Sequence, residues 1–229
     1  MTYLEIKQGM NKIVIQPLVM WRRRKQFKDK TPTIISVNCI GGGLYHDFGW
    51  KFLSPTINLF FYPDDYICFV TRLHEYVKEP LSFVRTGYSG KEYPICTLGD
   101  GNKLKKIEIH FLHYNNYQEC CEKWADRCNR IKWNNILLIF TDQNGCTLKN
   151  IKDFLQLPYP KMLFYGKTDV TGIYSDENTI LIPVSPTKLE KKRKENPVDH
   201  CMIFKGFTGH RRYEENVNIC DFIHRITYL

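Results

Sequence analysis

The chain has 229 residues, of which 43% are hydrophobic and 14% aromatic, and its formal net charge at pH 7 is +9. A chain with this apolar content can bury a core, so it is not expected to be disordered, and residues 1–229 are predicted to form one domain. The positive charge suits a phosphorylated substrate or an anionic lipid. No helix-turn-helix, zinc-finger or RRM pattern occurs, so no nucleic-acid partner is expected.

The nine cysteines argue for a reducing environment. Their number is odd and no signal-peptide pattern opens the sequence, so a disulfide framework is not expected and a cytoplasmic location is. No Cys-x-x-Cys pair occurs, and no zinc or other metal site is predicted. No run of 18 apolar residues is present, so no segment is expected to span a membrane.

Residues 1–30 predict a basic, mostly helical segment, which Pro17 is expected to break or kink. An aromatic residue beside a basic run can lie on the inner face of an anionic membrane. The alternative is a docking helix with one hydrated face. The residues concerned are Trp21, Arg22, Arg23 and Arg24.

Strand and helix patterns alternate from residue 33 onward. Residues 33–40 are apolar and β-branched and predict a buried strand, which a glycine turn and a helix over 44–52 follow. Residues 54–61 predict a second strand. Pro63 and Asp64 suit the first turn of a helix that is expected to reach Glu79.

The second half of the chain continues this alternation. Glycines indicate loops over 84–104, and 186–229 is interpreted as a C-terminal extension. Further strands are predicted at 106–113, 135–141, 162–165 and 179–183, and further helices at 117–131, 147–157 and 217–226. The pattern as a whole predicts a three-layer α/β/α fold with a mainly parallel or mixed sheet of about six strands.

In such a fold, ligands bind beyond the carboxyl ends of the strands. Asn38 and Cys39 end the first predicted strand, and Gly41 and Gly42 follow it. Backbone N–H groups at a glycine turn can bind an anion or a developing oxyanion, and a thiol there can act as a nucleophile. The alternative for Cys39 is that it is simply buried, as free cysteines commonly are.

Other polar residues lie at predicted strand ends or helix starts. His46 and His113 are candidate general bases. The alternative for His46 is a polar start of the helix, and the alternative for His113 is a hydrogen-bonded structural histidine. Asp142 either binds a ligand or caps the following turn. Cys39, His113 and Asp142 could act together as nucleophile, base and orienting acid. Asp64 and Lys167 are the remaining candidate ligand-binding residues.

Several stretches together resemble one bacterial family. They are Ile34–Gly42, Ser54–Tyr66 and Ile107–Tyr114, supported by Lys123–Trp133 and Phe140–Thr147. The chain resembles an exopolysaccharide- or capsule-biosynthesis family in which some members are labelled acetyltransferases. The family pattern often has Asn and Trp where this chain has Val37 and Ile40, which puts roles for those two side chains in doubt.

The resemblance implies an enzyme of surface-polysaccharide biosynthesis that acts on a sugar or nucleotide-sugar precursor. The favoured reaction is acyl transfer, with acyl-CoA as the suspected donor. One alternative is a metal-dependent glycosyltransferase that would hold its cation through Asp64 and Asp65 or through Asp142. Another is a non-catalytic component of an assembly complex that binds a sugar or a lipid carrier.

Overall fold

The centre of the protein is a parallel sheet of four strands in the order β1-β5-β6-β7. The computed structural model describes residues 11–170, 172, 176–204 and 210–227. The four strands are β1 (Thr33–Ser36), β5 (Ile136–Thr141), β6 (Lys161–Tyr165) and β7 (Thr179–Pro183). All six residues of β5 are buried, as expected for a parallel strand that is covered on both faces.

Helices cover both faces of this sheet, as the alternation predicted. Successive strand residues point to opposite faces, so Leu138 and Phe140 pack into one apolar cluster, and Leu137 and Ile139 pack into another. The first cluster includes residues of α4 (Pro63–Thr71), α5 (Leu73–Tyr76), α6 (Tyr117–Cys128) and α7 (Leu148–Leu155). The second includes residues of α3 (Ile40–Phe48) and α9 (Ile219–Thr227).

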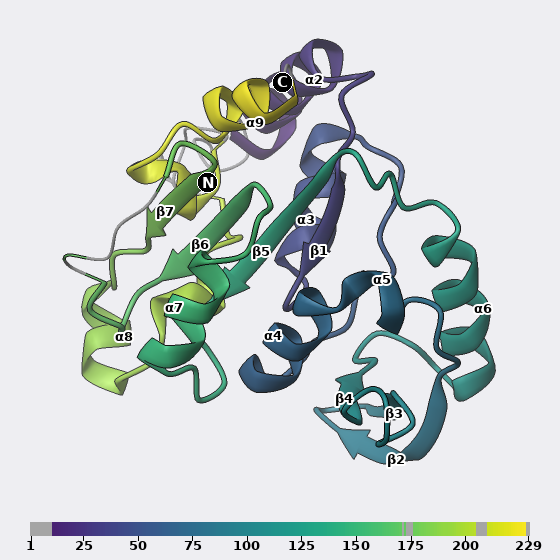
Figure 1. Ribbon diagram of the computed structural model, residues 1–229. Coiled ribbons are helices and arrows are strands. Elements are labelled where there is room, and N and C mark those ends of the chain that lie inside the picture. The colour runs from purple at the N-terminus through teal and green to yellow at the C-terminus, as the bar shows by residue number, and fades with distance from the viewer. Residues whose placement is uncertain (1–10, 171, 173–175, 205–209, 228–229) are drawn as a thin grey trace.

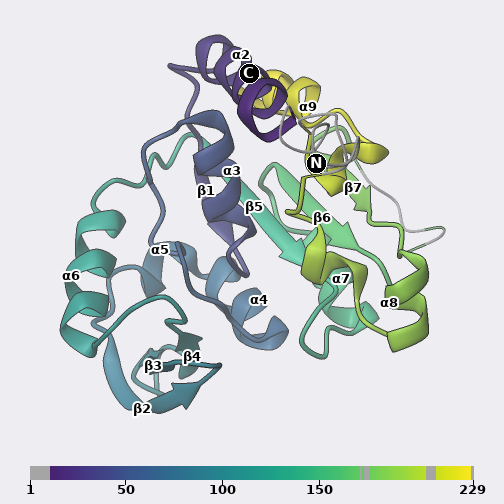
Figure 2. The ribbon, with the colours of Figure 1, turned by 180° about the vertical axis from the view of Figure 1, so that it is seen from behind.

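The segments near the two ends of the chain pack together. A short π-helix, η1 (Asn11–Ile15), leads into α2 (Gln16–Gln26), and Pro17 lies in the first turn of α2. Figures 1 and 2 show α2 beside α9 from both sides. Residues 1–10 of the predicted N-terminal helical segment lie outside the described residues. The C-terminal part also contains α8 (Lys188–Arg193), η2 (Pro197–His200) and η3 (Arg212–Glu215).

A second, antiparallel sheet corrects the prediction of a single sheet of about six strands. It contains β2 (Ser82–Tyr88), β3 (Glu92–Leu98) and β4 (Ile107–His110), and it lies beside α6 in Figure 1. Most of β2 and β3 falls in the region predicted as loops. Nearly every residue of β2 is exposed, so the alternating pattern that identifies a half-buried strand is absent there.

Residues 54–61 form a buried connection between the two sheets instead of the predicted strand. The Phe61 N–H donates to the Val37 carbonyl just beyond β1, at 2.9 Å. Phe60 and His110 exchange two backbone hydrogen bonds, both 2.9 Å long. Pro55 has no N–H to donate, and Asn58 has a φ of +60°, so neither fits a regular strand.

The helix boundaries differ from the predicted ones for local reasons. The helix predicted to begin at Leu44 begins at Ile40, because the glycines form its first turn. The helix predicted over 63–79 is divided at Arg72 into α4 and α5. The start of the helix predicted over 147–157 is confirmed, since Thr147 and Asn150 form a reciprocal capping box at the start of α7.

This cap yields a stability prediction. Thr147→Ala removes the Oγ1 atom that accepts the Asn150 N–H at 3.2 Å. The free energy of unfolding should fall by about 1 kcal/mol, whereas Thr147→Ser should keep most of the stability. Urea denaturation measures both variants. An equal loss in the two variants would show that the hydroxyl does not cap the helix.

Candidate functional site

A cleft of about 710 Å³ opens at the carboxyl ends of β1 and β5. This is the edge at which ligands bind in open α/β sheets. The antiparallel sheet and the C-terminal segment form its other walls. The lining residues are Asn38, Cys39, Ile40, Gly43, Phe60, Tyr88, Ser89, Tyr93, Leu112, Gln143, Asn144, Val198, Asp199, Cys201, Met202 and Arg211.

A chain of polar side chains runs across the cleft. Asn38 Nδ2 donates to Gln143 Oε1 at 2.7 Å, and the Gln143 amide donates in turn to the Asp199 carboxylate. Asn38 Oδ1 accepts the Ile40 N–H at 3.1 Å, which fixes the orientation of the Asn38 amide. Asp199 is exposed at the end of this chain. The cleft therefore offers amide groups and a carboxylate, a set that suits a ligand with several hydroxyl groups.

Aromatic residues line another part of the cleft. Phe60 is half-buried and stacks on the His110 imidazole, with ring centroids 4.3 Å apart. Tyr93 is nearly buried, whereas Tyr88 is 75% exposed. Aromatic rings of this kind present apolar faces to a ligand, and a tyrosine adds a polar hydroxyl.

Cys39 lies in the cleft, but its environment does not activate the thiol. Its Sγ is half-buried and lies 3.9 Å from the Leu59 carbonyl oxygen, which it meets as a weak donor. Burial raises the pKa of the Cys39 thiol to about 11. A nucleophilic cysteine needs the opposite shift. The structural alternative for Cys39 therefore fits its surroundings better than the nucleophile hypothesis.

The glycine turn packs α3 against β1. The Gly41 N–H donates to Ser36 Oγ at 3.2 Å, so this N–H group already has a partner inside the protein. A Cβ atom at Gly41 would lie 2.7 Å from the Ser36 Cβ. Gly41 and Gly42 are both buried. The predicted anion- or oxyanion-binding role is therefore not supported for Gly41.

Asp142 shapes the loop after β6. Its Oδ2 accepts the backbone N–H groups of Gly166, Lys167 and Thr168 at 2.8–2.9 Å. Its Oδ1 accepts Asn196 Nδ2 at 2.9 Å. Asp142 therefore caps a loop 24–26 residues further along the chain, and not the turn directly after β5 that the sequence predicted. The carboxylate also ties the C-terminal segment to the edge of the sheet.

The two candidate histidines are not among the residues that line the cleft. His113 is exposed in the turn after β4, and β4 belongs to the antiparallel sheet. No hydrogen bond joins Cys39, His113 and Asp142, so the structure does not assemble them as a catalytic set. The side chain of His46 is 74% exposed. The neighbouring Asp47 is buried and accepts Arg211 Nε at 2.7 Å.

Asp64 and Lys167 have separate surroundings. Asp64 Oδ1 accepts Asn150 Nδ2 at 2.6 Å, which ties α4 to α7. Lys167 Nζ donates to the Lys194 carbonyl at 2.6 Å. Lys167 and Asp142 line a hollow of about 480 Å³ that shares Gln143, Asn144 and Asp199 with the cleft. Within the described part of the chain, no group of three or more His, Cys, Asp and Glu side chains could hold a metal ion.

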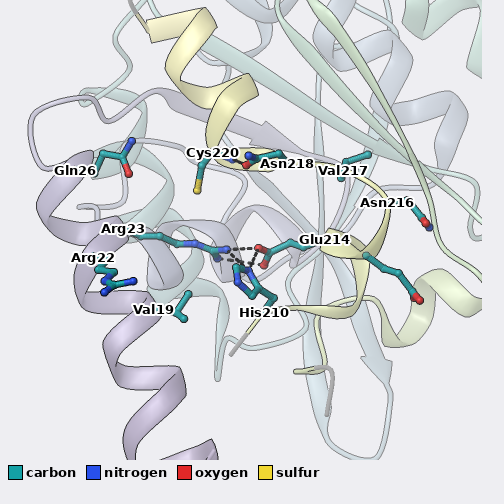
Figure 3. A pocket seen from close by; sticks show the side chains of 11 residues that line it. Val19, Arg22, Arg23, Gln26, His210, Glu214, Asn216, Val217, Asn218 and Cys220 are labelled. Carbon is teal, nitrogen blue, oxygen red and sulfur yellow. Dashed lines mark hydrogen bonds and ion pairs between the residues drawn. The ribbon is translucent and has the colours of Figure 1, made fainter. Parts of the chain in front are cut away.

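The basic N-terminal helix is docked through one of its arginines. Figure 3 shows Arg23 of α2 pointing toward Glu214 and His210 in a second pocket of about 580 Å³. Arg23 is 4% exposed, and its Nη1 donates to Glu214 Oε1 at 3.2 Å. Arg23 is therefore withdrawn from any membrane surface, which corrects its place in the predicted membrane contact.

The other residues of the predicted membrane contact differ in whether they bind within the protein. Arg24 Nη2 donates to the His46 carbonyl at 3.1 Å. Trp21 and Arg22 are exposed, so a peripheral contact through them stays a prediction. Among the described helices, none is both long and apolar enough to cross a membrane.

The sequence does not indicate that several of the cleft residues belong to a site. Tyr88 and Tyr93 fall in the region that was predicted as loops. Asp199 and Arg211 fall in the C-terminal extension, where no pattern connects them with the sheet. Gln143, by contrast, follows a strand that the sequence identifies, and the rule on carboxyl ends points to its position.

The fold and the cleft define a class: an α/β protein with a ligand-sized polar and aromatic cleft at the carboxyl edge of its parallel sheet. The chain belongs to the family described as "Domain of unknown function (DUF1919)", which matches residues 10–224. It is 31% identical over 192 residues to an uncharacterized protein of Haemophilus influenzae, a match that covers 84% of each chain.

The two neighbouring glycines yield a paired prediction. Gly41→Ala should lower the free energy of unfolding by about 1–3 kcal/mol, because its Cβ would overlap Ser36 in a packed core. Gly42→Ala should be neutral or stabilising. Its Cβ would make an ordinary contact with Asn58, and alanine favours a helix by about 1 kcal/mol over glycine. Thermal and urea unfolding compare the two, and equal effects would contradict the packing account.

The Cys39 thiol yields a prediction of low reactivity. With a pKa of about 11, native Cys39 should react with iodoacetamide at pH 7.5 roughly 100-fold or more slowly than in the unfolded chain. The rate should rise about tenfold per pH unit up to pH 10, because only the thiolate reacts. Mass spectrometry of the labelled peptide measures it. A rate that levels off below pH 8 would restore the nucleophile hypothesis.

Proposed function

We propose that the cleft binds a carbohydrate, the sugar part of a surface-polysaccharide precursor, and that the protein transfers a group to one of its hydroxyls. The observation that carries the proposal is the hydrogen-bonded chain from Asn38 through Gln143 to Asp199, together with the aromatic residues of the cleft. The resemblance of the sequence motifs to a polysaccharide-biosynthesis family supports the same class of ligand.

The chemistry of the lining matches that of a sugar. Each sugar hydroxyl is both a donor and an acceptor, and amides and a carboxylate provide complementary partners. The C–H faces of a sugar ring are apolar and can pack on rings such as Phe60 and Tyr93. A volume of about 710 Å³ lies within the range of about 300–1,000 Å³ that is typical of small-molecule sites.

The charge of the cleft favours the sugar over a phosphate group. Among the described residues that line it, Arg211 is the one cation, and its guanidinium is bound to the buried Asp47 carboxylate. Asp199 adds a negative charge at the exposed end of the hydrogen-bonded chain. The phosphates of an acyl-CoA or nucleotide donor would therefore lie outside this cleft, since its described lining offers them no unpaired cation.

Acyl transfer remains the proposed reaction, without Cys39 as the acyl carrier. The raised pKa of its thiol disfavours a covalent acyl-cysteine. In this proposal the sugar hydroxyl attacks the acyl donor directly. The glycosyl-transfer alternative through a bound cation gains no support from Asp64 or Asp142, since both carboxylates already accept hydrogen bonds within the protein.

Calorimetric titration tests the proposal with glucose, galactose, their N-acetylamino forms, UDP-sugars and acetyl-CoA. At least one sugar should bind. Asp199→Asn should weaken its binding about 10-fold or more, since a hydrogen bond to a charged group contributes about 1.5–3 kcal/mol. Gln143→Ala should weaken it about 2- to 10-fold, since a neutral hydrogen bond contributes about 0.5–1.5 kcal/mol.

Matched controls come from exposed positions away from the cleft. Gln156 is exposed at the end of α7, and Asp29 is exposed after α2, so Gln156→Ala and Asp29→Asn should bind like the wild type. Sugar binding that Gln143→Ala and Asp199→Asn leave unchanged would place the sugar elsewhere. Binding of acetyl-CoA alone would contradict the proposal that the cleft recognises the sugar.

A further inference from the structure

One face of the antiparallel sheet carries a polar cluster behind the cleft. The strand register places Gly87 opposite Tyr93, and Ile95 opposite His110. Residues that are directly opposite, or two apart on one strand, share a face of the sheet. Tyr93, His110 and Glu108 therefore lie on one face, together with Arg85 of β2.

These side chains form a continuous series of polar contacts. Tyr93 Oη lies 3.3 Å from His110 Nδ1. His110 Nε2 lies 2.9 Å from Glu108 Oε1, a close ion-pair contact without hydrogen-bond geometry. The Glu108 carboxylate accepts two hydrogen bonds from the Arg85 guanidinium, at 2.7 and 2.8 Å. The series therefore leads from the arginine to a tyrosine that lines the cleft.

The negative charge of Glu108 favours one tautomer of the histidine. With this carboxylate 2.9 Å from Nε2, the neutral ring should carry its hydrogen on Nε2, which leaves Nδ1 to accept from the Tyr93 hydroxyl. Burial lowers the pKa of His110, Glu108 and Asp65 act in the opposite direction, and Arg85 adds to the lowering. A neutral imidazole that faces a hydroxyl on one side and a carboxylate on the other is the arrangement of a general base.

The surroundings hold these groups in place. Phe60 stacks on the imidazole, and the Tyr62 ring meets it edge-on at 5.2 Å between centroids. A Cβ atom at Gly87 would lie 2.6–2.8 Å from the outer atoms of the Tyr93 ring. Glycine within a strand commonly marks such a close approach. Gly87 thus allows the Tyr93 ring to lie across β2 with its hydroxyl next to His110.

We propose that Tyr93 is a catalytic residue of the cleft, and that His110 and Glu108 act through it as the proton-accepting pair. This inference rests on the proposed function, because Tyr93 needs a bound sugar as its partner. The hydrogen bond from Tyr93 to His110 is long, at 3.3 Å, and catalytic contacts commonly tighten when a substrate binds.

With an acyl thioester as the donor, the proton taken from the sugar hydroxyl is returned to the leaving thiolate. The sugar O–H bond breaks, its proton passes to the Tyr93 oxygen, and the original Tyr93 proton passes to His110 Nδ1. The sugar oxygen uses the freed electron pair to bond to the thioester carbonyl carbon. The C–S bond then breaks, and the departing thiolate receives a proton back from His110 through Tyr93. The products are a sugar ester and a thiol.

Nitrogen NMR of protein labelled with ¹⁵N-histidine tests the series in the free protein. At pH 7, His110 should carry its hydrogen on Nε2. Tyr93→Phe should move the Nδ1 resonance toward that of an imine nitrogen without a hydrogen bond. Tyr88→Phe, on the same hairpin, should not move it. Glu108→Gln should remove the preference for the Nε2–H tautomer, which gives a second variant if Tyr93→Phe fails to fold.

A titration of uniformly ¹⁵N-labelled protein with glucose, galactose and their N-acetylamino forms separates this inference from the proposed function. A sugar that shifts both the Asn38 side-chain amide and His110 Nδ1 supports the inference, provided that Tyr93→Phe abolishes only the His110 shift. A shift of Asn38 alone, or a His110 that carries its hydrogen on Nδ1, overturns the inference and leaves sugar binding intact. If no sugar shifts Asn38, the proposed function fails, and the inference fails with it.

Discussion

The architecture depends on the backbone hydrogen bonds that residues 54–61 make with both sheets. Phe61 bonds to the end of β1, and Phe60 bonds to His110 at the end of β4. A buried backbone must satisfy its N–H and C=O groups, so this connection fixes how the two sheets meet. The cleft opens where they meet. One of its walls therefore comes from parallel strands and another from an antiparallel hairpin.

Several charged side chains around the cleft are already bound to other groups of the protein, and this determines which groups remain to bind a ligand. Asp142 is saturated by backbone N–H groups and Asn196, and Asp47 holds Arg211. Breaking such buried contacts is costly, because it would leave a charge without partners. These groups shape the site and are not open to a ligand. The groups left to meet a ligand are the amides, Asp199 and the aromatic rings.

The sequence was sufficient for the parallel sheet and for the edge that carries the site. The apolar runs of β1 and β5 are unambiguous, and the rule on carboxyl ends leads directly to Asn38 and Gln143. The sequence could not reveal β2, because its exposed residues lack the alternation of a half-buried strand. Nor could it place Asp199 and Arg211 beside the cleft, because their position depends on tertiary packing. His113 is the candidate that the sequence identifies, because the strand is predicted to end there. The strand ends at His110, and it is this histidine that has a carboxylate and a tyrosine as neighbours.

The most direct measurement is a crystal structure of the protein with the monosaccharide that binds most tightly. The sugar ring should lie in the cleft beside Phe60, with hydroxyls within hydrogen-bonding distance of Gln143 and Asp199. A sugar found instead in the pocket between α2 and the segment around Glu214, with the cleft at β1 and β5 empty, would contradict the account.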